Sequence, residues 1–280
     1  MFDVKIIKDS ISPENIRLIT FQMKYPRYIH AELMTHRVFS RSASSSRAVP
    51  VNKLADLALE EMVKPIRWGL NQPGMQANEQ NLEGKALEEA NKVWEEAAVF
   101  CANSSKRLAE LGLHKQWANR LTEWFGNINV VVSSTEWTNW DELRAHPDAQ
   151  PEIKHLAELM IEARRKSIPT LINHSEWHLP YVTDEEKQDP FFKIEANRFM
   201  LPKISTARCA RVSYLKHDGT SPNIDDDLAL YQRLVGFRPQ HMSPTEHIAY
   251  PDVLVDGKWK DQTKHGNFRG WSQFRKLIEL

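Results

Sequence analysis

The sequence has little of what marks secreted, membrane or generally basic proteins. Its 280 residues contain two cysteines, Cys101 and Cys209, which cannot form a disulfide framework. No apolar run approaches the roughly 20 residues that span a bilayer, and the N-terminus has no signal-peptide pattern. Lys plus Arg equals Asp plus Glu at 37 each, which argues against a generally basic nucleic-acid binder. We therefore expect a cytoplasmic globular protein with no membrane partner, and the charge balance disfavours a nucleic-acid partner.

The sequence also lacks a recognisable metal motif, although it contains 11 histidines. Neither His-Glu-x-x-His nor Cys-x-x-Cys occurs. His174 and His178 are four residues apart, but their stretch is short and ends at Pro180. We expect no metal site.

The hydrophobic pattern indicates mixed ends around a helical middle. Alternation over 4–7 and 16–23 predicts two strands separated by a turn at 12–14. Pro26 opens a predicted helix that runs towards 35–37, and a serine-rich loop follows over 40–50. Apolar spacings of three and four predict further helices in the middle of the chain: over 84–111, from Leu113 through Ile128, and around Trp137 and Trp140. Three more are predicted towards the C-terminus: one after Asp148 as N-cap, one that begins at Ser205 and one through 228–234.

This order of elements is typical of an α+β protein. We expect a single domain over 1–280, with a mixed or antiparallel sheet packed on the helical middle region. Residues 173–203 look irregular. Trp94, Trp117 and Trp124 are expected on buried helix faces.

The stretch from Thr35 to Arg47 has the most unusual composition, with three Arg, one His and five Ser in thirteen residues. Arginine forks pair bidentately with phosphate, and serine hydroxyls and backbone N–H groups complete such a cradle. The stretch lacks the P-loop pattern. A solvated basic loop or a phosphorylation target explains the composition equally well.

Three other stretches each have a structural explanation. In 241–247, Ser243 as N-cap and Glu246 three residues later form a capping box, which leaves His241 and His247 unexplained. Cys209, which precedes Ala-Arg-Val-Ser, is a small residue of the kind usually found in cores. Arg144 could reach a ligand, but its spacing favours a bond to helix carbonyl groups.

Together these stretches resemble the flavin-dependent thymidylate synthases. The family signature, Arg-His-Arg followed by seven residues and Ser, is matched by His36-Arg37 and Ser45, with Arg47 where the family also has Arg. The family's Ala-Arg-Val-Ser segment is matched at 210–213, and its His-x-Ser/Thr-Pro-Phe-Glu-His segment at 241–247, with Thr245 in place of Phe. Its Leu-Arg-Ala…Ala-Gln-x-Glu-Ile segment is matched at 143–153.

The order of these segments differs from that of the family. The segments at 210–213 and 241–247 come first in usual members and last here. This order predicts a circular permutation, which is physically reasonable because domain termini often lie close together. Residues 51–85 and 170–203 then become probable insertions.

The resemblance implies an enzyme that methylates C5 of dUMP to give dTMP. FAD, NADPH and methylenetetrahydrofolate would be the cofactors, and no cysteine nucleophile is needed. The protein would be a homo-oligomer, as in the family's tetramers. The residues implied to contact FAD are His36, Arg37, Asn139, Ser213, His241 and Ser243. Those implied to hold the nucleotide are Glu32, Ser45, Ser46, Arg47, Arg120 and Arg144, of which Ser45 and Arg144 are the catalytic candidates.

Some positions depart from the family pattern. Thr35 replaces an Arg, Ser42 and Ala43 replace Asn-Glu, and Glu32 stands where Gln is common. A carboxylate only accepts hydrogen bonds, so Glu32 changes which base edge can be read. Two alternatives therefore stay open: a flavin-dependent C5 methyl- or hydroxymethyltransferase acting on another pyrimidine nucleotide such as dCMP, or a non-catalytic protein that binds nucleotide or nucleic-acid phosphates.

Overall fold

Two long strands near the N-terminus lie at the centre of a five-stranded mixed sheet. The computed structural model describes residues 2–77, 80–212 and 223–279. The predicted strand pair is confirmed as an antiparallel hairpin, β1 (Asp3–Ile11) and β2 (Arg17–Pro26). The strand order is β3-β4-β2-β1-β5, and only β5 runs parallel to its neighbour. The remaining strands of this sheet are β3 (Ser40–Ala43), β4 (Asn127–Ser134) and β5 (Thr170–Leu171).

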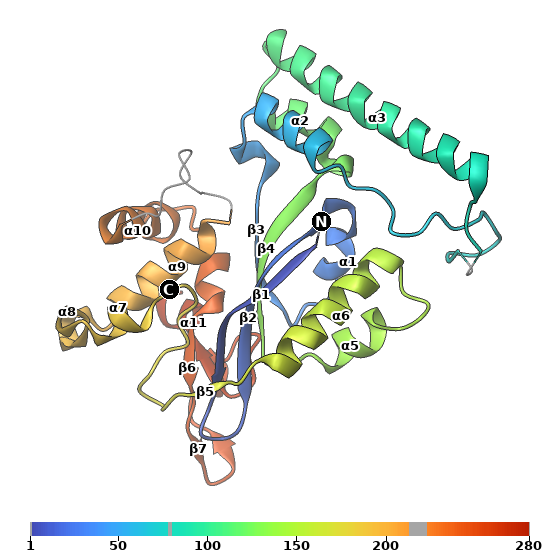
Figure 1. Ribbon diagram of the computed structural model, residues 1–280. Coiled ribbons are helices and arrows are strands. Elements are labelled where there is room, and N and C mark those ends of the chain that lie inside the picture. Colours follow the sequence, from blue (N-terminus) through green and yellow to red (C-terminus); the bar gives the residue numbers. More distant parts are fainter. Residues whose placement is uncertain (1, 78–79, 213–222, 280) are drawn as a thin grey trace.

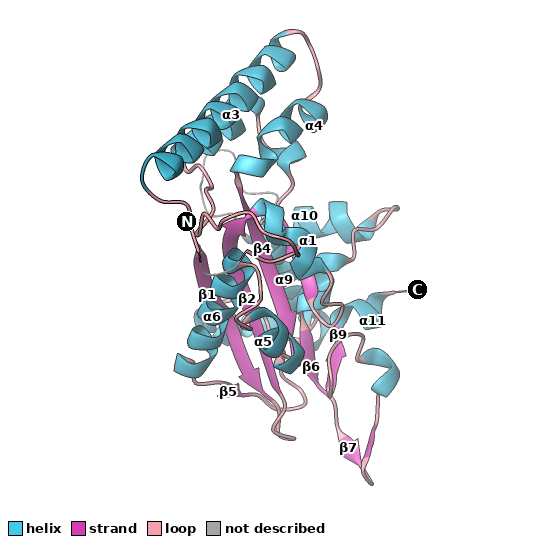
Figure 2. Ribbon diagram, turned by 90° about the vertical axis from the view of Figure 1, so that its right-hand side faces the viewer, coloured by secondary structure: helices cyan, strands magenta, loops and turns pink. Residues whose placement is uncertain are grey.

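Helices from the first 170 residues cover one face of this sheet and one end of it (Figures 1 and 2). Near the sheet face lie the 3₁₀ helix η1 (Arg27–Ile29), α1 (His30–Met34), α5 (Thr138–Arg144) and α6 (Pro151–Lys166). At the end lie η2 (Ser46–Ala48), α2 (Val51–Glu60), α3 (Gly84–Glu110), α4 (Lys115–Ala118) and the 3₁₀ helix η3 (Asn119–Phe125).

The C-terminal part of the chain lies on the opposite face of the sheet (Figure 1). Its helices are α7 (Asp184–Gln188), α8 (Pro190–Lys193), η4 (Glu195–Asn197), α9 (Met200–Ala210), α10 (Ile224–Tyr231), the π-helix η5 (Gln232–Gly236), the 3₁₀ helices η6 (Ser243–His247) and η7 (Gln262–Lys264), and α11 (Phe274–Ile278). Its short strands are β6 (Ala249–Pro251), β7 (Leu254–Val255), β8 (Lys258–Trp259) and β9 (Trp271–Gln273).

The face of the sheet towards α5 and α6 is apolar. Alternate residues of β2, namely Ile19, Phe21, Met23 and Tyr25, are buried in one cluster with residues of β4, α1, α5 and α6. Phe21 contacts the Trp137 ring edge-to-face at 5.3 Å. Burial of one such side chain contributes about 1.5–3 kcal/mol to stability. This face supplies the main hydrophobic core, and the predicted α+β fold class is confirmed.

The opposite face is polar and yet buried. A chain of hydrogen bonds runs across it from Ser10 to His178, Thr20, Ser133 and His247, with atom separations of 2.9, 2.8, 2.6 and 2.9 Å, and it ends at Ser42, 3.0 Å from His247 Nε2. Both imidazoles are fully buried. Burial lowers the pKa of His247 to about 3 and holds that of His178 well below its usual range. Both histidines are therefore neutral links between the sheet and the C-terminal part.

Several sequence predictions about the middle of the chain are wrong. Part of the predicted 40–50 loop is the strand β3, which pairs with β4. Ser40 and Ser42 alternate along it and are both buried on the polar face of the sheet. The helix predicted from Leu113 through Ile128 divides into α4 and η3, and Ile128 lies in β4, where the β-branched run at 130–132 favours a strand. Trp117 and Trp124 are 62% and 58% exposed, so they do not lie on buried helix faces.

Two predicted helix caps are also wrong. The cap residue of α6 is Gln150 rather than Asp148, and Pro151 at the first position needs no N–H partner. Ser243 makes no capping bond, and a 3₁₀ helix forms there with Thr245 Oγ1 donating to the Met242 carbonyl at 2.6 Å. The stretch 173–203, predicted to be irregular, contains short helices, one with a capping box at Thr183. Within the described ranges, no helix is both long and apolar enough to cross a membrane.

Candidate functional site

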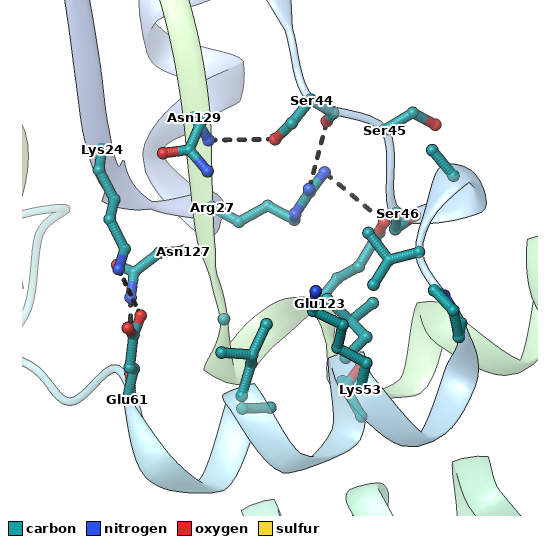
Figure 3. Close-up of a pocket in the computed structure, with 18 of the residues that line it drawn as sticks. Lys24, Arg27, Ser44, Ser45, Ser46, Lys53, Glu61, Glu123, Asn127 and Asn129 are labelled. Carbon is teal, nitrogen blue, oxygen red and sulfur yellow. Dashed lines mark hydrogen bonds and ion pairs between the residues drawn. The ribbon is translucent and has the colours of Figure 1, made fainter. Parts of the chain in front are cut away.

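A cavity of about 270 Å³ opens where the polar face emerges from beneath the C-terminal part. Lys24 of β2 and Asn127 and Asn129 of β4 have the same strand parity as the buried Thr20 and Ser133, so they continue the polar face into the cavity. The Ser44–Ser46 segment, α2 and η3 form the other walls (Figure 3). We call this cavity the Ser44 pocket. Its lining includes Lys24, Arg27, Ser44, Ser45, Ser46, Lys53, Leu54, Glu61, Glu123, Asn127, Asn129 and Val212.

The serine segment is held in a defined conformation by η3. The amide of the buried Asn119 donates to the carbonyl oxygens of Ser46 and Val49 at 2.7 and 2.9 Å. Ser44 Oγ accepts a hydrogen bond from the backbone N–H of Asn129 at 3.1 Å. Two of the predicted nucleotide residues, Ser45 and Ser46, therefore line a pre-formed pocket.

Charged side chains surround this pocket. Lys24 Nζ lies 2.5 Å from Glu61 Oε2, and Lys53 is exposed at the rim. The predicted residue Arg120 does not line the pocket but donates to both oxygens of Glu123, which does, at 2.8 and 3.0 Å. Asn127 Oδ1 is buried with no hydrogen-bond partner among the described residues. The walls therefore offer cations to a polar ligand.

A second cluster contains three more of the predicted residues, Glu32, His36 and Arg144, the last of which belongs to α5. Arg144 Nη1 donates to Glu32 Oε2 at 2.7 Å, its Nε to His36 Nε2 at 3.0 Å, and its Nη2 to Thr35 Oγ1 at 3.1 Å. Since Nε2 of His36 accepts from a guanidinium, this ring is neutral. Burial, followed by the charges of Arg144 and Arg41, lowers the His36 pKa. The cluster fixes the orientation of Arg144, whose side chain is 15% exposed.

The structure does not bring these two groups together in one cavity. None of the described residues Glu32, His36 and Arg144 lines the Ser44 pocket. The other predicted residues that the structure describes have exposed side chains: Arg37, Arg47, Asn139, His241 and Ser243. Ser213 lies outside the described residues, although its neighbour Val212 lines the pocket.

The structure explains two motif residues that the sequence left open. His247 connects Ser42 with Ser133 inside the polar face, so its role there is structural. Arg211 of the Ala-Arg-Val-Ser segment pairs with the buried Asp227 at 2.8 Å, which anchors the segment beside Val212. Cys209 is buried, as expected of a core residue.

The sequence reasoning missed Lys24, Arg27, Lys53, Asn127 and Asn129 in the pocket wall. One signal was present, because polar residues alternate through Thr20-x-Gln22-x-Lys24 and Ser40-x-Ser42-x-Ser44. This period of two marks a second, polar face of the same strands. Arg27 and Lys53 carry no such signal.

The fold and the pocket define a mixed α+β protein with cationic side chains around a serine-rich segment. A family model described as thymidylate synthase complementing protein matches residues 9–170. Because this match spans more than half of the chain, the chain belongs to that family, the flavin-dependent thymidylate synthases, which are nucleotide methyltransferases. The match ends before the segments at 210–213 and 241–247, so their permuted order stays a prediction.

Solved structures with a detectable likeness include two nucleotide-bound proteins. The UMP/dUMP methylase PolB from Streptomyces cacaoi, bound with 5-Br UMP, is 16% identical with a TM-score of 0.48, over 59% of this chain and 89% of that chain. The flavin-dependent thymidylate synthase ThyX from Helicobacter pylori, complexed with FAD and dUMP, is 21% identical with a TM-score of 0.36, over 52% of this chain and 67% of that chain. Scores of this size add no argument about the ligand of this chain. No curated protein matches the sequence.

Proposed function

We propose that this protein methylates C5 of dUMP to give dTMP, with methylenetetrahydrofolate as the carbon donor, NADPH as the source of electrons and FAD as the flavin. The observation that carries the proposal is the Ser44 pocket. Ser45, which belongs to the family signature, and its neighbour Ser46 line a cavity that also has cationic side chains in its walls. Val212, which belongs to the family's Ala-Arg-Val-Ser segment, lines the same cavity. Together with family membership, this favours a nucleotide in the pocket.

In this proposal the serine segment and nearby arginines hold the nucleotide. Ser45 and Ser46 would offer hydroxyl groups to it, and Arg47 and Arg120 would offer guanidinium groups. Arg144 would face the base, where a guanidinium stabilises negative charge that develops on the base carbonyl oxygens. Glu32 and His36 orient Arg144 through the bonds at 2.7 and 3.0 Å. Ser45 and Arg144 are the two proposed catalytic residues.

The exposed polar residues of the family segments fit a flavin nucleotide. Arg37 is solvent-exposed and can pair with the flavin pyrophosphate, while Asn139, His241 and Ser243 offer further hydrogen-bonding groups on the surface. His36 and Ser213 complete the proposed set. Bound FAD would supply hydride chemistry. The residues of this chain would bind it, orient it and neutralise its phosphates.

A homotetramer would bring the two clusters of one site together from different subunits. The surface supports association, because an apolar groove lies between α3 and η3, lined by Trp68, Val93, Trp94, Trp124 and Phe125. Large exposed apolar patches mark interaction surfaces. We propose a cytoplasmic homotetramer, and light scattering of the purified protein measures the subunit number.

We also propose that residues 1–280 form one circularly permuted domain with insertions at 51–85 and 170–203. The position of η6 supports this proposal. His247 of η6 bonds to Ser42 of β3 and Ser133 of β4, so the displaced segment lies beside the strands of the signature region. Within 51–85, α2 forms a wall of the Ser44 pocket.

A second candidate function is C5 methylation or hydroxymethylation of a cytosine nucleotide such as dCMP. The Glu32 carboxylate beside Arg144 favours it, because a carboxylate accepts hydrogen bonds and an amino group on the base donates them. Tritium release from C5-labelled dUMP and dCMP separates the two functions. Release from dCMP alone would exclude dTMP synthesis as the activity.

The absorbance spectrum of the purified protein, with and without dUMP, tests the main proposal. We expect a flavin band that dUMP perturbs, and Arg37→Ala should lose the yellow colour while the fold is retained. Arg165→Ala, which changes an exposed arginine of α6, is the matched control and should keep the flavin. A colourless wild-type protein that takes up no added FAD would instead indicate a phosphate-binding protein without turnover.

A further inference from the structure

Arg27 is a partly buried cation whose contacts are unusually long. Its side chain is 18% exposed at the end of β2. Its Nη2 donates to the Ser44 carbonyl at 3.4 Å, and its Nη1 lies 3.6 Å from Glu123 Oε1. Charge-assisted hydrogen bonds are normally about 2.7–2.9 Å long. Burial lowers the Arg27 pKa, with Glu123 opposing that effect, which reflects how incompletely the charge is compensated.

The nearest carboxylate is shared with a second guanidinium. Glu123 receives both of its close hydrogen bonds from Arg120 and none from Arg27. Figure 3 shows the Arg27 side chain reaching across the pocket, with its contacts to Ser44 and Glu123 drawn as dashed lines. One carboxylate in the wall of the Ser44 pocket therefore faces two guanidinium groups, Arg27 within the lining and Arg120 outside it.

The charge around the pocket suits a phosphate monoester. Among the described residues that line the pocket or pair with its lining, four cations face two carboxylates: Lys24, Arg27, Lys53 and Arg120 against Glu61 and Glu123. A phosphate monoester carries about −1.5 to −2 charges near pH 7. Such a ligand would neutralise the excess without requiring another protein group.

We infer that Arg27 binds the phosphate group of the nucleotide monophosphate, and that the Glu123 carboxylate occupies the position of this phosphate until the ligand displaces it. The inference rests on the proposed function for the identity of the nucleotide. No family segment includes either residue, so the assignment comes from the pocket alone. Glu123 is thus an internal competitor: its Oε1 lies 3.6 Å from Nη1 of Arg27, the guanidinium that a phosphate would use.

The first experiment titrates the FAD-loaded protein with dUMP and follows the flavin absorbance. We expect Arg27→Ala to weaken dUMP binding at least tenfold without loss of FAD, and Glu123→Gln to tighten it severalfold. In the double variant the gain from Glu123→Gln should disappear, because the two residues act on one phosphate. Arg165→Ala is the matched control. Unchanged dUMP affinity in Arg27→Ala, or loss of FAD in place of dUMP, would overturn the inference.

The second experiment does not depend on flavin or on turnover. Melting temperatures are compared in inorganic phosphate and in chloride at equal ionic strength. Phosphate should stabilise the wild-type protein, stabilise Glu123→Gln more and leave Arg27→Ala unchanged. Equal stabilisation of wild type and Arg27→Ala, or none in either, contradicts the site. If phosphate raises the melting temperature only when Arg27 is present, and the protein binds no dUMP, the phosphate site is supported and the proposed function is rejected.

Discussion

The two faces of the central sheet are both buried but by different means. Towards α5 and α6, Ile19, Phe21 and Met23 pack in an apolar cluster. On the other face, Thr20 and Ser133 take part in a hydrogen-bonded chain through two neutral histidines. The C-terminal part also docks there through Tyr181, which donates to Gln22, and Gln273, which donates to Ser40. The apolar face derives its stability from the area that it buries, whereas the polar face derives it from hydrogen bonds among its buried side chains.

This difference determines where a ligand site can form. An apolar face closes without gaps, because any void loses packing energy. A polar face can be left open at one end, because water or a ligand satisfies its groups there. The Ser44 pocket occupies that open end, with Lys24, Asn127 and Asn129 as the uncovered members of the polar rows.

The largest effect is expected on the apolar face. Phe21→Ala should lower the free energy of unfolding by about 3–5 kcal/mol, because it removes a fully buried ring and leaves a cavity. Urea denaturation followed by circular dichroism measures this loss. Phe237→Ala, at an exposed phenylalanine, is the control and should cost far less. Equal losses in the two variants would contradict the assignment of this face as the main core.

A smaller loss is expected when one member of the polar chain is replaced by a residue of equal shape. Thr20→Val keeps the volume but leaves His178 and Ser133 without their shared partner, so it should cost about 1–3 kcal/mol. The same denaturation measurement applies. Thr170→Val on the exposed strand β5 should change stability by less than about 0.5 kcal/mol. A neutral Thr20→Val would mean that the chain contributes nothing.

Acid should destabilise the polar face selectively. The unfolded chain takes up a proton on each histidine below about pH 6.5, whereas buried His247, with its pKa lowered to about 3, does not. The contribution is complete above pH 6.5 and is lost as the pH falls towards 3, at about 1.4 kcal/mol per pH unit for each such histidine. Denaturation curves at pH 7, 6 and 5 measure the slope. This slope gives the number of protons taken up on unfolding. His247→Gln should lower that number by about one, and His146→Gln, at an exposed histidine, should leave it unchanged. Equal slopes in all three proteins would refute the effect.

The smallest effect is expected in the partly exposed cluster around Arg144, away from the Ser44 pocket. Glu32→Gln removes one charge from a partly exposed ion pair and leaves the bond between Arg144 and His36, so it should cost less than about 1 kcal/mol. The melting temperature and denaturation midpoint measure it. A loss above about 2 kcal/mol would show that this cluster is as costly to disturb as the buried polar chain.

The sequence predicted those elements whose periodicity is simple. The β1–β2 hairpin and α3 followed directly from alternation and from spacings of three and four. The start of β4 was missed because the apolar residues at 117, 121, 124 and 128 have the spacing of a buried helix face. In the structure the tryptophans among them are exposed, and Ile128 belongs to β4. The serines of the pocket were predicted by composition and by family resemblance. Arg27 was not, because nothing near it in the sequence indicates a site.

The sequence by itself determined the apolar rows that form the core, the serine-rich signature and the family to which the chain belongs, because these depend on residues close together along the chain. Only the tertiary structure decided how the polar rows are covered and where they stay open. The Ser44 pocket joins residues 24–27, 44–46, 53–61 and 122–129, which come within reach only when β2 and β4 pair and α2 and η3 pack beside them. His247 lies more than 200 residues from Ser42 along the chain, so the bond between them exists only in the folded state.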